Sequence, residues 1–134
     1  MNILISACLL GAPCRYDGTG KLEPALERLR AQGHTLVPVC PEVLGGLPTP
    51  RPPAERQPDG RVVTREGADV TAEYRAGAEK ALALAQEHGC TCAVLKERSP
   101  SCGRGQIYDG TFSHTLIPGS GVAAQLLEEQ GIAV

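Results

Sequence analysis

Short apolar runs alternate with amphipathic segments along the chain. The first run, residues 3–7, is almost continuously apolar, which is typical of a strand covered on both faces in a parallel sheet. Apolar runs at residues 36–39 and 93–95 predict two more strands, and a weaker run at residues 112–117 predicts a fourth. Pro38 lies inside the second run, and it favours an edge position or a bulge because proline cannot donate to a sheet ladder.

Segments with helical periodicity separate these runs. Apolar residues recur three and four positions apart over residues 22–29 and again over residues 69–88, where Asp69 suits an N-cap. A third helix is expected to follow Ser120, which would cap it. This rhythm predicts an α/β fold with one domain over residues 1–134, a Rossmann-like sheet of mostly parallel strands with helices on both faces.

Residues 41–69 interrupt the rhythm with a Pro/Gly-rich insertion. Four of its prolines fall within residues 48–53, and Pro58-Asp59-Gly60 has the composition of a hairpin turn leading into residues 61–64. Long insertions of this kind often build binding or catalytic sites.

Composition and charge exclude several classes of function. Hydrophobic residues make up 42% of the chain and charged residues 21%, which is typical of a folded globular protein. Aromatic residues are only 3% and the net charge is -2, so bulk nucleic-acid binding is not expected. No apolar run reaches the ~20 residues of a membrane span, and the first residues lack the basic start of a secretory signal. We therefore expect a cytoplasmic protein without a membrane partner.

Three of the six cysteines are expected at one edge of the sheet. Cys8 ends the first predicted strand, Cys40 ends the second, and Cys102 follows the third. Because parallel strands end at the same edge, these thiols should converge there. In a reducing compartment, clustered cysteines more often bind metal or act in catalysis than form crosslinks.

Three converging thiolates suit a zinc site, an iron-sulfur cluster, or a nucleophile with resolving thiols. Zinc would need a fourth ligand, for which the candidates are His34, His88 and His114. Two of these are expected on the far edge of the sheet, so ordinary surface or core positions are the better interpretation of the histidines.

The remaining cysteines fit less well into such a site. Cys90 and Cys92 enter the third predicted strand from the opposite edge, where cysteine commonly acts as a small hydrophobic residue. Cys14 follows Cys8 closely in the first loop and could lie near the site without belonging to it.

Polar residues accompany the three converging cysteines. Glu42 follows Cys40 by two positions and is a candidate general base. Ser99 and Ser101 precede Cys102 and are candidate hydroxyl donors. The sequence Gly119-Ser120-Gly121 opens the last predicted helix, whose positive end would suit an anion at the same edge.

Four motifs in combination resemble the thiouracil desulfidases, a bacterial enzyme family, and the resemblance covers nearly the whole chain. The motifs are Ser6-Ala7-Cys8-Leu9-Leu10-Gly11, Arg15-Tyr16-Asp17-Gly18, Val39-Cys40-Pro41-Glu42, and Lys96 with Arg98-Ser99-Pro100-Ser101-Cys102-Gly103.

The resemblance implies a cofactor and a set of site residues. It implies a 4Fe-4S cluster held by Cys8, Cys40 and Cys102, with the fourth iron left open. It further implies catalysis by Glu42 and by one of Ser99 and Ser101. Cys14 lies outside this ligand set, but a fourth ligand from Cys14 would close the cluster.

The leading hypothesis from this resemblance is a nonredox, hydrolytic desulfuration of a thiolated pyrimidine of the thiouracil or thiouridine type. The open iron would act as a Lewis acid on the thiocarbonyl sulfur, Glu42 would take a proton from the attacking water, and a serine would orient that water. Arg15, Lys96 and Arg98 are candidate substrate contacts. Free bases, nucleosides and nucleotides all fit as substrates.

Two alternatives belong to other classes of function. A non-catalytic metal or redox binding module would use Cys14 to complete a four-thiolate site. A thiol-dependent sulfurtransferase would use Cys102 as its nucleophile and would not need iron.

Overall fold

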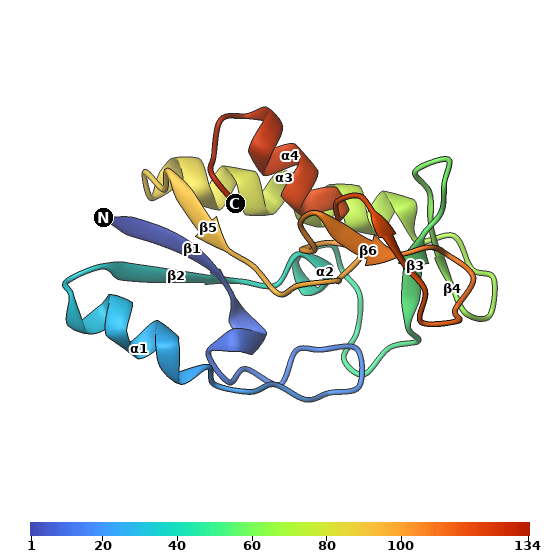
Figure 1. Cartoon of the computed structure of the whole chain (residues 1–134), viewed down its shortest axis with the longest axis horizontal. Helices are drawn as coiled ribbons and strands as arrows, with labels where there is room; N and C mark the ends of the chain where they lie inside the picture. Colours follow the sequence, from blue (N-terminus) through green and yellow to red (C-terminus); the bar gives the residue numbers. More distant parts are fainter.

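The computed structural model describes all 134 residues and shows a mixed α/β domain built around a small parallel sheet (Figure 1). The sheet has three strands, β1 (Asn2–Ser6), β2 (Thr35–Val39) and β5 (Cys92–Val94), in the order β2-β1-β5. Both pairings are parallel, which confirms the α/β prediction. Pro38 is accommodated because β2 is an edge strand, as predicted.

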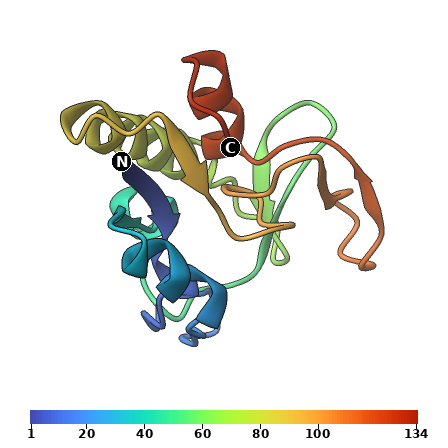
Figure 2. The ribbon, with the colours of Figure 1, turned by 60° about the vertical axis from the view of Figure 1, so that its left-hand side comes forward.

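Helices lie on both faces of this sheet. Figure 2 shows α1 (Pro24–Ala31) on one side of the strands, and α3 (Thr71–Glu87) with α4 (Val122–Glu129) on the other. The hairpin over residues 106–118, orange to red at the right of this view, lies away from the sheet and does not extend it.

The central strand β1 supplies the core of both faces. Ile3 and Ile5 point to one side, where they pack with Leu26 of α1. Leu4 points to the other side and packs in the same cluster as Leu127 of α4. Leu4, Ile5 and Leu127 have no exposed surface, and burying a side chain of this size contributes about 1.5–3 kcal/mol. The continuous apolar run of β1 thus reflects burial on both faces.

Shorter elements follow the strands. The 3-10 helix η1 (Ala7–Leu9) continues β1, and the short helix α2 (Pro41–Leu44) continues β2. Two antiparallel hairpins complete the fold, β3 (Ala54–Arg56) with β4 (Val62–Thr64), and β6 (Gln106–Tyr108) with β7 (Leu116–Pro118). The β3–β4 pair is the hairpin that the turn residues predicted.

The predicted fourth strand at residues 112–117 is wrong. Only Leu116–Pro118 is a strand there, and it pairs with β6 outside the parallel sheet. Phe112 and His114 have φ angles of 59° and 58°, and this left-handed backbone is incompatible with an extended strand. The apolar pattern did not reveal this tight turn.

Two predicted helix caps are displaced by one residue. Helix α3 begins at Thr71 with Val70 as its N-cap, but the Asp69 carboxylate still accepts a hydrogen bond from the Thr71 amide at 2.9 Å. Helix α4 has Gly121 rather than Ser120 at its N-cap. In both cases the helix begins within two residues of the predicted position.

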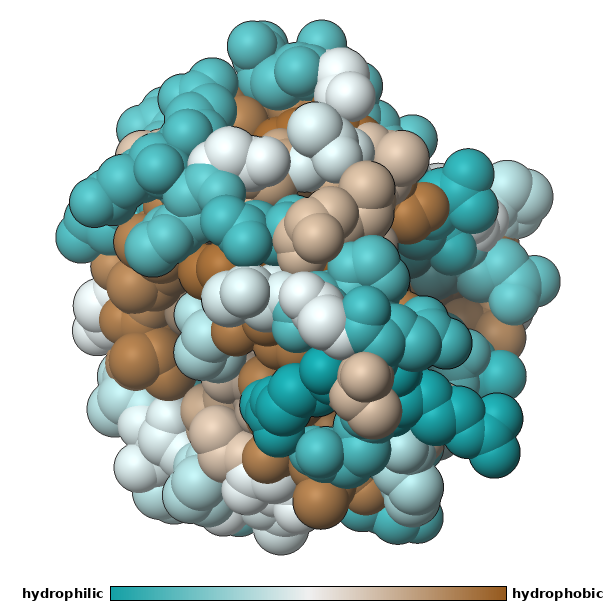
Figure 3. All heavy atoms as spheres, turned by 90° about the vertical axis from the view of Figure 1, so that its left-hand side faces the viewer, coloured by the Kyte–Doolittle hydropathy of each residue, from teal (hydrophilic) through white to brown (hydrophobic).

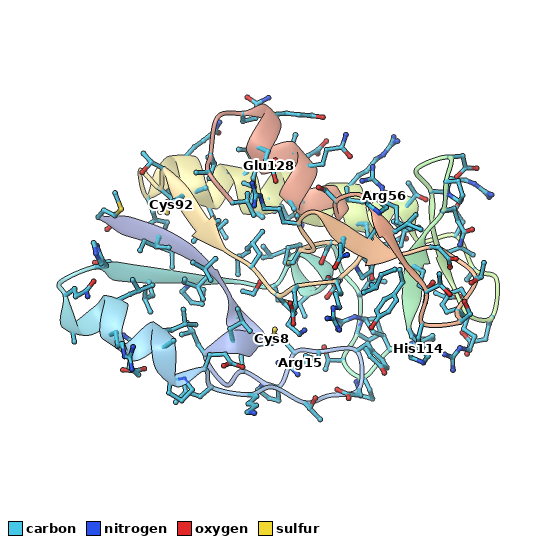
Figure 4. All side chains as sticks on the ribbon, in the orientation of Figure 1. Cys8, Arg15, Arg56, Cys92, His114 and Glu128 are labelled. Atoms are coloured by element: carbon cyan, nitrogen blue, oxygen red, sulfur yellow. The ribbon has the colours of Figure 1, made fainter.

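Different residues lie at the two ends of the parallel sheet. Figure 3 views the end where β1 begins, and hydrophobic atoms lie there in separate patches among hydrophilic ones. Figure 4 places Cys92 toward this end and Cys8 with Arg15 toward the opposite end, where the strands finish. No helix combines the length and the apolar character that crossing a membrane requires.

Candidate active site

The three cysteines expected at one edge all follow strands of the parallel sheet. Cys8 lies in η1 directly after β1, Cys40 is the N-cap of α2 directly after β2, and Cys102 lies in the loop after β5. Cys8 and Cys102 are buried, and Cys40 is partly buried. All six cysteines of the chain are free thiols. The parallel sheet therefore delivers three thiols to its carboxyl edge from distant parts of the sequence.

Glu42 lies between the cysteine of its own helix and the serine loop. Its Oε1 accepts a hydrogen bond from Ser101 Oγ at 2.7 Å and lies 3.4 Å from Ser99 Oγ. Its Oε2 lies 3.9 Å from Cys40 Sγ and forms an ion pair of 2.6 Å with Arg51 Nη2. Each carboxylate oxygen thus has its own set of partners.

The two serines differ in exposure and in bonding. Ser101 is fully buried, and its Oγ lies 3.4 Å from Cys102 Sγ. Ser99 is partly exposed, and its Oγ accepts hydrogen bonds from the amides of Ser101 and Cys102 at 3.1 and 3.2 Å. The hydroxyls of the two serines are 3.0 Å apart. Ser99 is therefore the serine with access to a ligand, and Ser101 connects Glu42 to the loop.

The serine loop is fixed by the start of α4. The amides of Ala123 and Ala124 donate to the Ser101 carbonyl at 2.8 and 3.0 Å, and the Gly121 amide donates to the Gly103 carbonyl at 2.8 Å. These amides hold loop carbonyls, so the anion site expected at this helix start is wrong.

Helix α2 is held just as closely against α3. A Cβ at Gly77 of α3 would overlap the Pro41 carbonyl oxygen, and a Cβ at Gly45 would overlap the Glu73 carbonyl oxygen. Only glycine permits this approach of two helix backbones. The contact fixes the helix that carries Glu42.

Arg51 is the site residue that the sequence analysis missed. It lies in the Pro/Gly-rich segment, and its side chain is only 4% exposed. Besides Glu42, it donates to the Cys14 carbonyl at 2.9 Å, to Thr49 Oγ1 at 3.0 Å and to the Pro48 carbonyl at 3.3 Å. The only available indication was an arginine among prolines, which does not distinguish a buried charge from an exposed one.

The three basic residues expected to contact a substrate are dispersed. Arg15 follows Cys14, and its Nε is buried without a hydrogen-bond partner. Lys96 Nζ bonds only the neighbouring Glu97 carbonyl at 3.3 Å. Arg98 is exposed, has a φ of 64°, and its backbone forms an isolated β-bridge with Ile107. Of the three residues, Arg15 is the one with a buried hydrogen-bond donor that has no partner.

Burial raises the pKa of two thiols at this edge. It raises the pKa of Cys102 to about 12, and the charge of Glu42 adds to the effect. Burial also raises the pKa of Cys14 to about 12, with Cys40 and then Cys8 as its neighbouring sulfur groups. The Cys102 thiol is therefore neutral at pH 7 when no metal is bound, and metal binding would release its proton.

The chemistry of the donor set is compatible with an iron-sulfur group. The thiols of Cys8, Cys40 and Cys102 come from three segments of the chain that follow the strands of one sheet. Iron-sulfur clusters are held by cysteine thiolates. The sulfur chemistry of the site therefore suits an iron-sulfur group.

The other cysteines and the histidines lie elsewhere. Cys90 is a buried member of the core that includes Leu4, and Cys92 packs on the opposite face of the sheet. His34 contacts the Met1 amine at 3.2 Å, His88 ends α3, and His114 packs edge-on against Tyr108. The prediction that Cys90 is a core residue is confirmed.

The sequence profile of the 2-thiouracil desulfurase family matches residues 3–134. The chain belongs to this family. As a member of it, the protein is similar to YbbK of Bacillus subtilis (strain 168), an uncharacterized protein, with 45% identity over 98% of this chain and 93% of YbbK. It is also similar to the solved structure of the 4Fe-4S-dependent thiouracil desulfidase TudS (DUF523Vcz). That match has a TM-score of 0.92 and 52% identity, and covers 99% of this chain and 88% of TudS.

Proposed function

We propose that this protein is an iron-sulfur-dependent desulfidase that replaces the sulfur of a thiolated pyrimidine, of the thiouracil or thiouridine type, with oxygen. The family membership and the similarity to TudS support the substrate class and a 4Fe-4S cofactor. The single observation that carries the proposal is the position of Glu42, which shares one site with the thiols of Cys40 and Cys102 and with two serine hydroxyls.

The residues that would hold the cluster are Cys8, Cys40 and Cys102. When bound through three cysteines, such a cluster supplies an open iron that acts as a Lewis acid toward a thiocarbonyl sulfur. Cys14 lies beside Cys40, but its carbonyl oxygen is engaged by Arg51 and faces the Cys40 thiol at 3.7 Å. These contacts assign the Cys14 main chain to the support of the site. Its thiol stays outside the proposed ligand set, as the resemblance to the family implies.

Glu42 is the proposed general base for a nonredox, hydrolytic reaction. Its Oε1 faces the serine hydroxyls, whereas its Oε2 is bound by Arg51, so Oε1 is the oxygen that takes the proton of water. Ser99 orients that water because it is the partly exposed serine beside Oε1. Buried Ser101 holds the carboxylate in place. General-base assistance of this kind is typically worth ~10²- to 10⁴-fold.

Arg15 is the proposed contact for the substrate among the basic residues. Its Nε is a buried donor without a partner, and a pyrimidine carbonyl oxygen would satisfy it. Lys96 and Arg98 remain candidates of second rank because Lys96 bonds locally and Arg98 is exposed. The substrate is a small thiolated base, nucleoside or nucleotide.

We also propose that residues 1–134 act as one desulfidase domain of Rossmann-like plan, with the Pro/Gly-rich insertion as part of the site. Arg51 supports this role of the insertion, because it bonds both Glu42 and Cys14. The six free thiols suit the reducing cytoplasm.

The proposal is tested by measuring sulfide release from 2-thiouracil and 4-thiouracil with anaerobically reconstituted protein. Glu42→Gln keeps the size of the side chain and removes the base, so sulfide release per bound cluster should fall at least ~10²-fold. Iron and acid-labile sulfide are measured for each variant. Cys102→Ala should lose iron. Arg61→Ala, which removes only an exposed ion pair with Asp59, is the control. Sulfide release that persists in Glu42→Gln would remove the assigned base.

A further inference from the structure

Arg51 is a buried charge that connects three segments of the candidate site. Its guanidinium reaches Glu42 of α2 at 2.6 Å and the Cys14 carbonyl at 2.9 Å with the same nitrogen, Nη2. Its own amide donates to the Tyr16 carbonyl at 2.7 Å. Arg51 therefore binds the loop after Cys8 through both its main chain and its side chain, and it binds the proposed base as well.

The burial of this ion pair argues for a specific role. The side chains of Arg51 and Glu42 are only 4% and 14% exposed, so bulk water solvates both charges poorly. Removing one member would leave the other charged group buried without compensation, which proteins tolerate poorly. The other terminal nitrogen, Nη1, bonds Thr49 Oγ1 and the Pro48 carbonyl, so the guanidinium is held in one orientation.

The orientation of Arg51 distinguishes the two oxygens of Glu42. Arg51 occupies Oε2, and the hydroxyls of Ser99 and Ser101 lie at Oε1. A carboxylate with one oxygen bound by a planar guanidinium cannot rotate freely. The ion pair thus leaves the serine-facing oxygen as the one that can accept a proton from water.

We propose that Arg51 is a positioning residue that locks Glu42 with its Oε1 toward the serines and at the same time clamps the Cys14 loop beside Cys40. The catalytic half of this inference rests on the proposed function. The clamp does not, because it concerns how firmly the loop is held.

The side chain and the backbone of Cys14 can be separated in this scheme. Arg51 bonds the carbonyl oxygen of Cys14 and not its thiol. Cys14→Ala keeps that carbonyl, so it should preserve the clamp, whereas Arg51→Ala should release it. The two variants together distinguish a main-chain contact from a thiol effect.

The experiment measures the steady-state kinetics of sulfide release and the rate at which an iron chelator bleaches the visible absorption of the reconstituted protein. Arg51→Ala is expected to lower kcat ~10²-fold with KM changed less than about twofold, because the base is misplaced and not the substrate. It should also bleach several-fold faster than the wild type. Methylguanidinium should restore part of both properties.

Arg51→Lys and Arg61→Ala complete the design. Lysine carries the charge without the planar fork, so it should recover the folded protein but only part of kcat. Arg61→Ala should match the wild type in both measurements. If Arg51→Ala does not fold, Arg51→Lys carries the same comparison.

Three results would overturn the inference. A raised KM with unchanged kcat would make Arg51 a substrate contact. Unchanged kcat and unchanged bleaching in Arg51→Ala would remove its role. Arg51 would be merely structural if Arg51→Ala lost both kcat and resistance to bleaching, if methylguanidinium restored neither, and if Arg51→Lys showed the same full loss. If wild-type protein releases no sulfide from thiouracil, the proposed function fails, while the bleaching comparison still tests the clamp.

Discussion

Gly121→Ala is the substitution for which the structure predicts the sharpest local effect. Gly121 is the N-cap of α4 and has an ordinary φ of -68°, so alanine is compatible with its backbone. An added Cβ would lie 2.6 Å from the Ser101 carbonyl oxygen and 2.8 Å from the Cys102 amide nitrogen. These distances fall 0.8 and 0.6 Å short of the 3.4 Å at which ordinary contact begins. The serine loop or the helix must therefore retreat.

The expected cost follows from this overlap. Overpacking of this kind costs about 1–3 kcal/mol. The smaller entropy of an unfolded alanine offsets about 0.4–1 kcal/mol of that cost. A net loss near 1–2 kcal/mol corresponds to a fall in Tm of roughly 3–10 °C for a chain of this size. Displacing the loop by much of an ångström also moves Ser101 Oγ, which now lies 2.7 Å from Glu42, and kcat should fall ~10²-fold.

Gly119→Ala is the matched control on the same connection. Its Cβ would meet only the Ile107 side chain, at 3.2 Å, and a side chain can turn away where a backbone cannot. Thermal unfolding, iron content and sulfide release should be measured for both variants. If Gly121→Ala equals Gly119→Ala in Tm and in kcat, close packing of Gly121 against the Ser101 carbonyl does not hold the serine loop.

The remaining predictions concern α2, the core, Cys14 and the metal. Gly77→Ala should lower both Tm and kcat, because the new Cβ overlaps the Pro41 carbonyl, although alanine favours helices over glycine by about 1 kcal/mol. A stabilised, fully active variant would contradict this contact. Leu127 has no exposed surface, so Leu127→Ala should lower the free energy of unfolding, measured with denaturant, by about 2–5 kcal/mol. A smaller loss would indicate that the core collapses around the cavity. Cys14→Ala should keep the wild-type iron content, and a loss of iron would favour a fourth thiolate ligand. Anaerobic removal of iron should lower Tm, because the metal binds the folded state, and should abolish sulfide release; activity without iron would favour a thiol-dependent sulfurtransferase.

The sequence was sufficient to predict how the cysteines are distributed over the sheet. The continuous apolar run of β1 and the alternation of strands with helices predict parallel strands, and parallel strands end at one edge. Placing Cys8 and Cys40 beyond that edge needs no knowledge of side-chain packing. This part of the site follows from topology alone.

The contact of Arg51 with Glu42 could not be predicted in the same way. Arg51 approaches Glu42 through an irregular segment, and the path of such a segment depends on tertiary contacts that have no periodic pattern. The predicted strand at residues 112–117 failed for a similar reason, because the positive φ angles of Phe112 and His114 are imposed by a turn. Local propensity carries little information where long-range contacts determine the backbone.

Helix packing connects Glu42 to Ser101 by a route that does not pass through their hydrogen bond. Helix α2 rests on α3 through Gly77, α3 and α4 share one core, and α4 meets the serine loop through Gly121. These contacts form a continuous path from one side chain to the other, independent of the hydrogen bond between them. Ser101→Ala would remove that hydrogen bond but leave the helix contacts intact. Gly121→Ala keeps both the Glu42 carboxylate and the Ser101 hydroxyl but displaces the backbone that carries Ser101. Gly121→Ala should therefore lower kcat more than Ser101→Ala does.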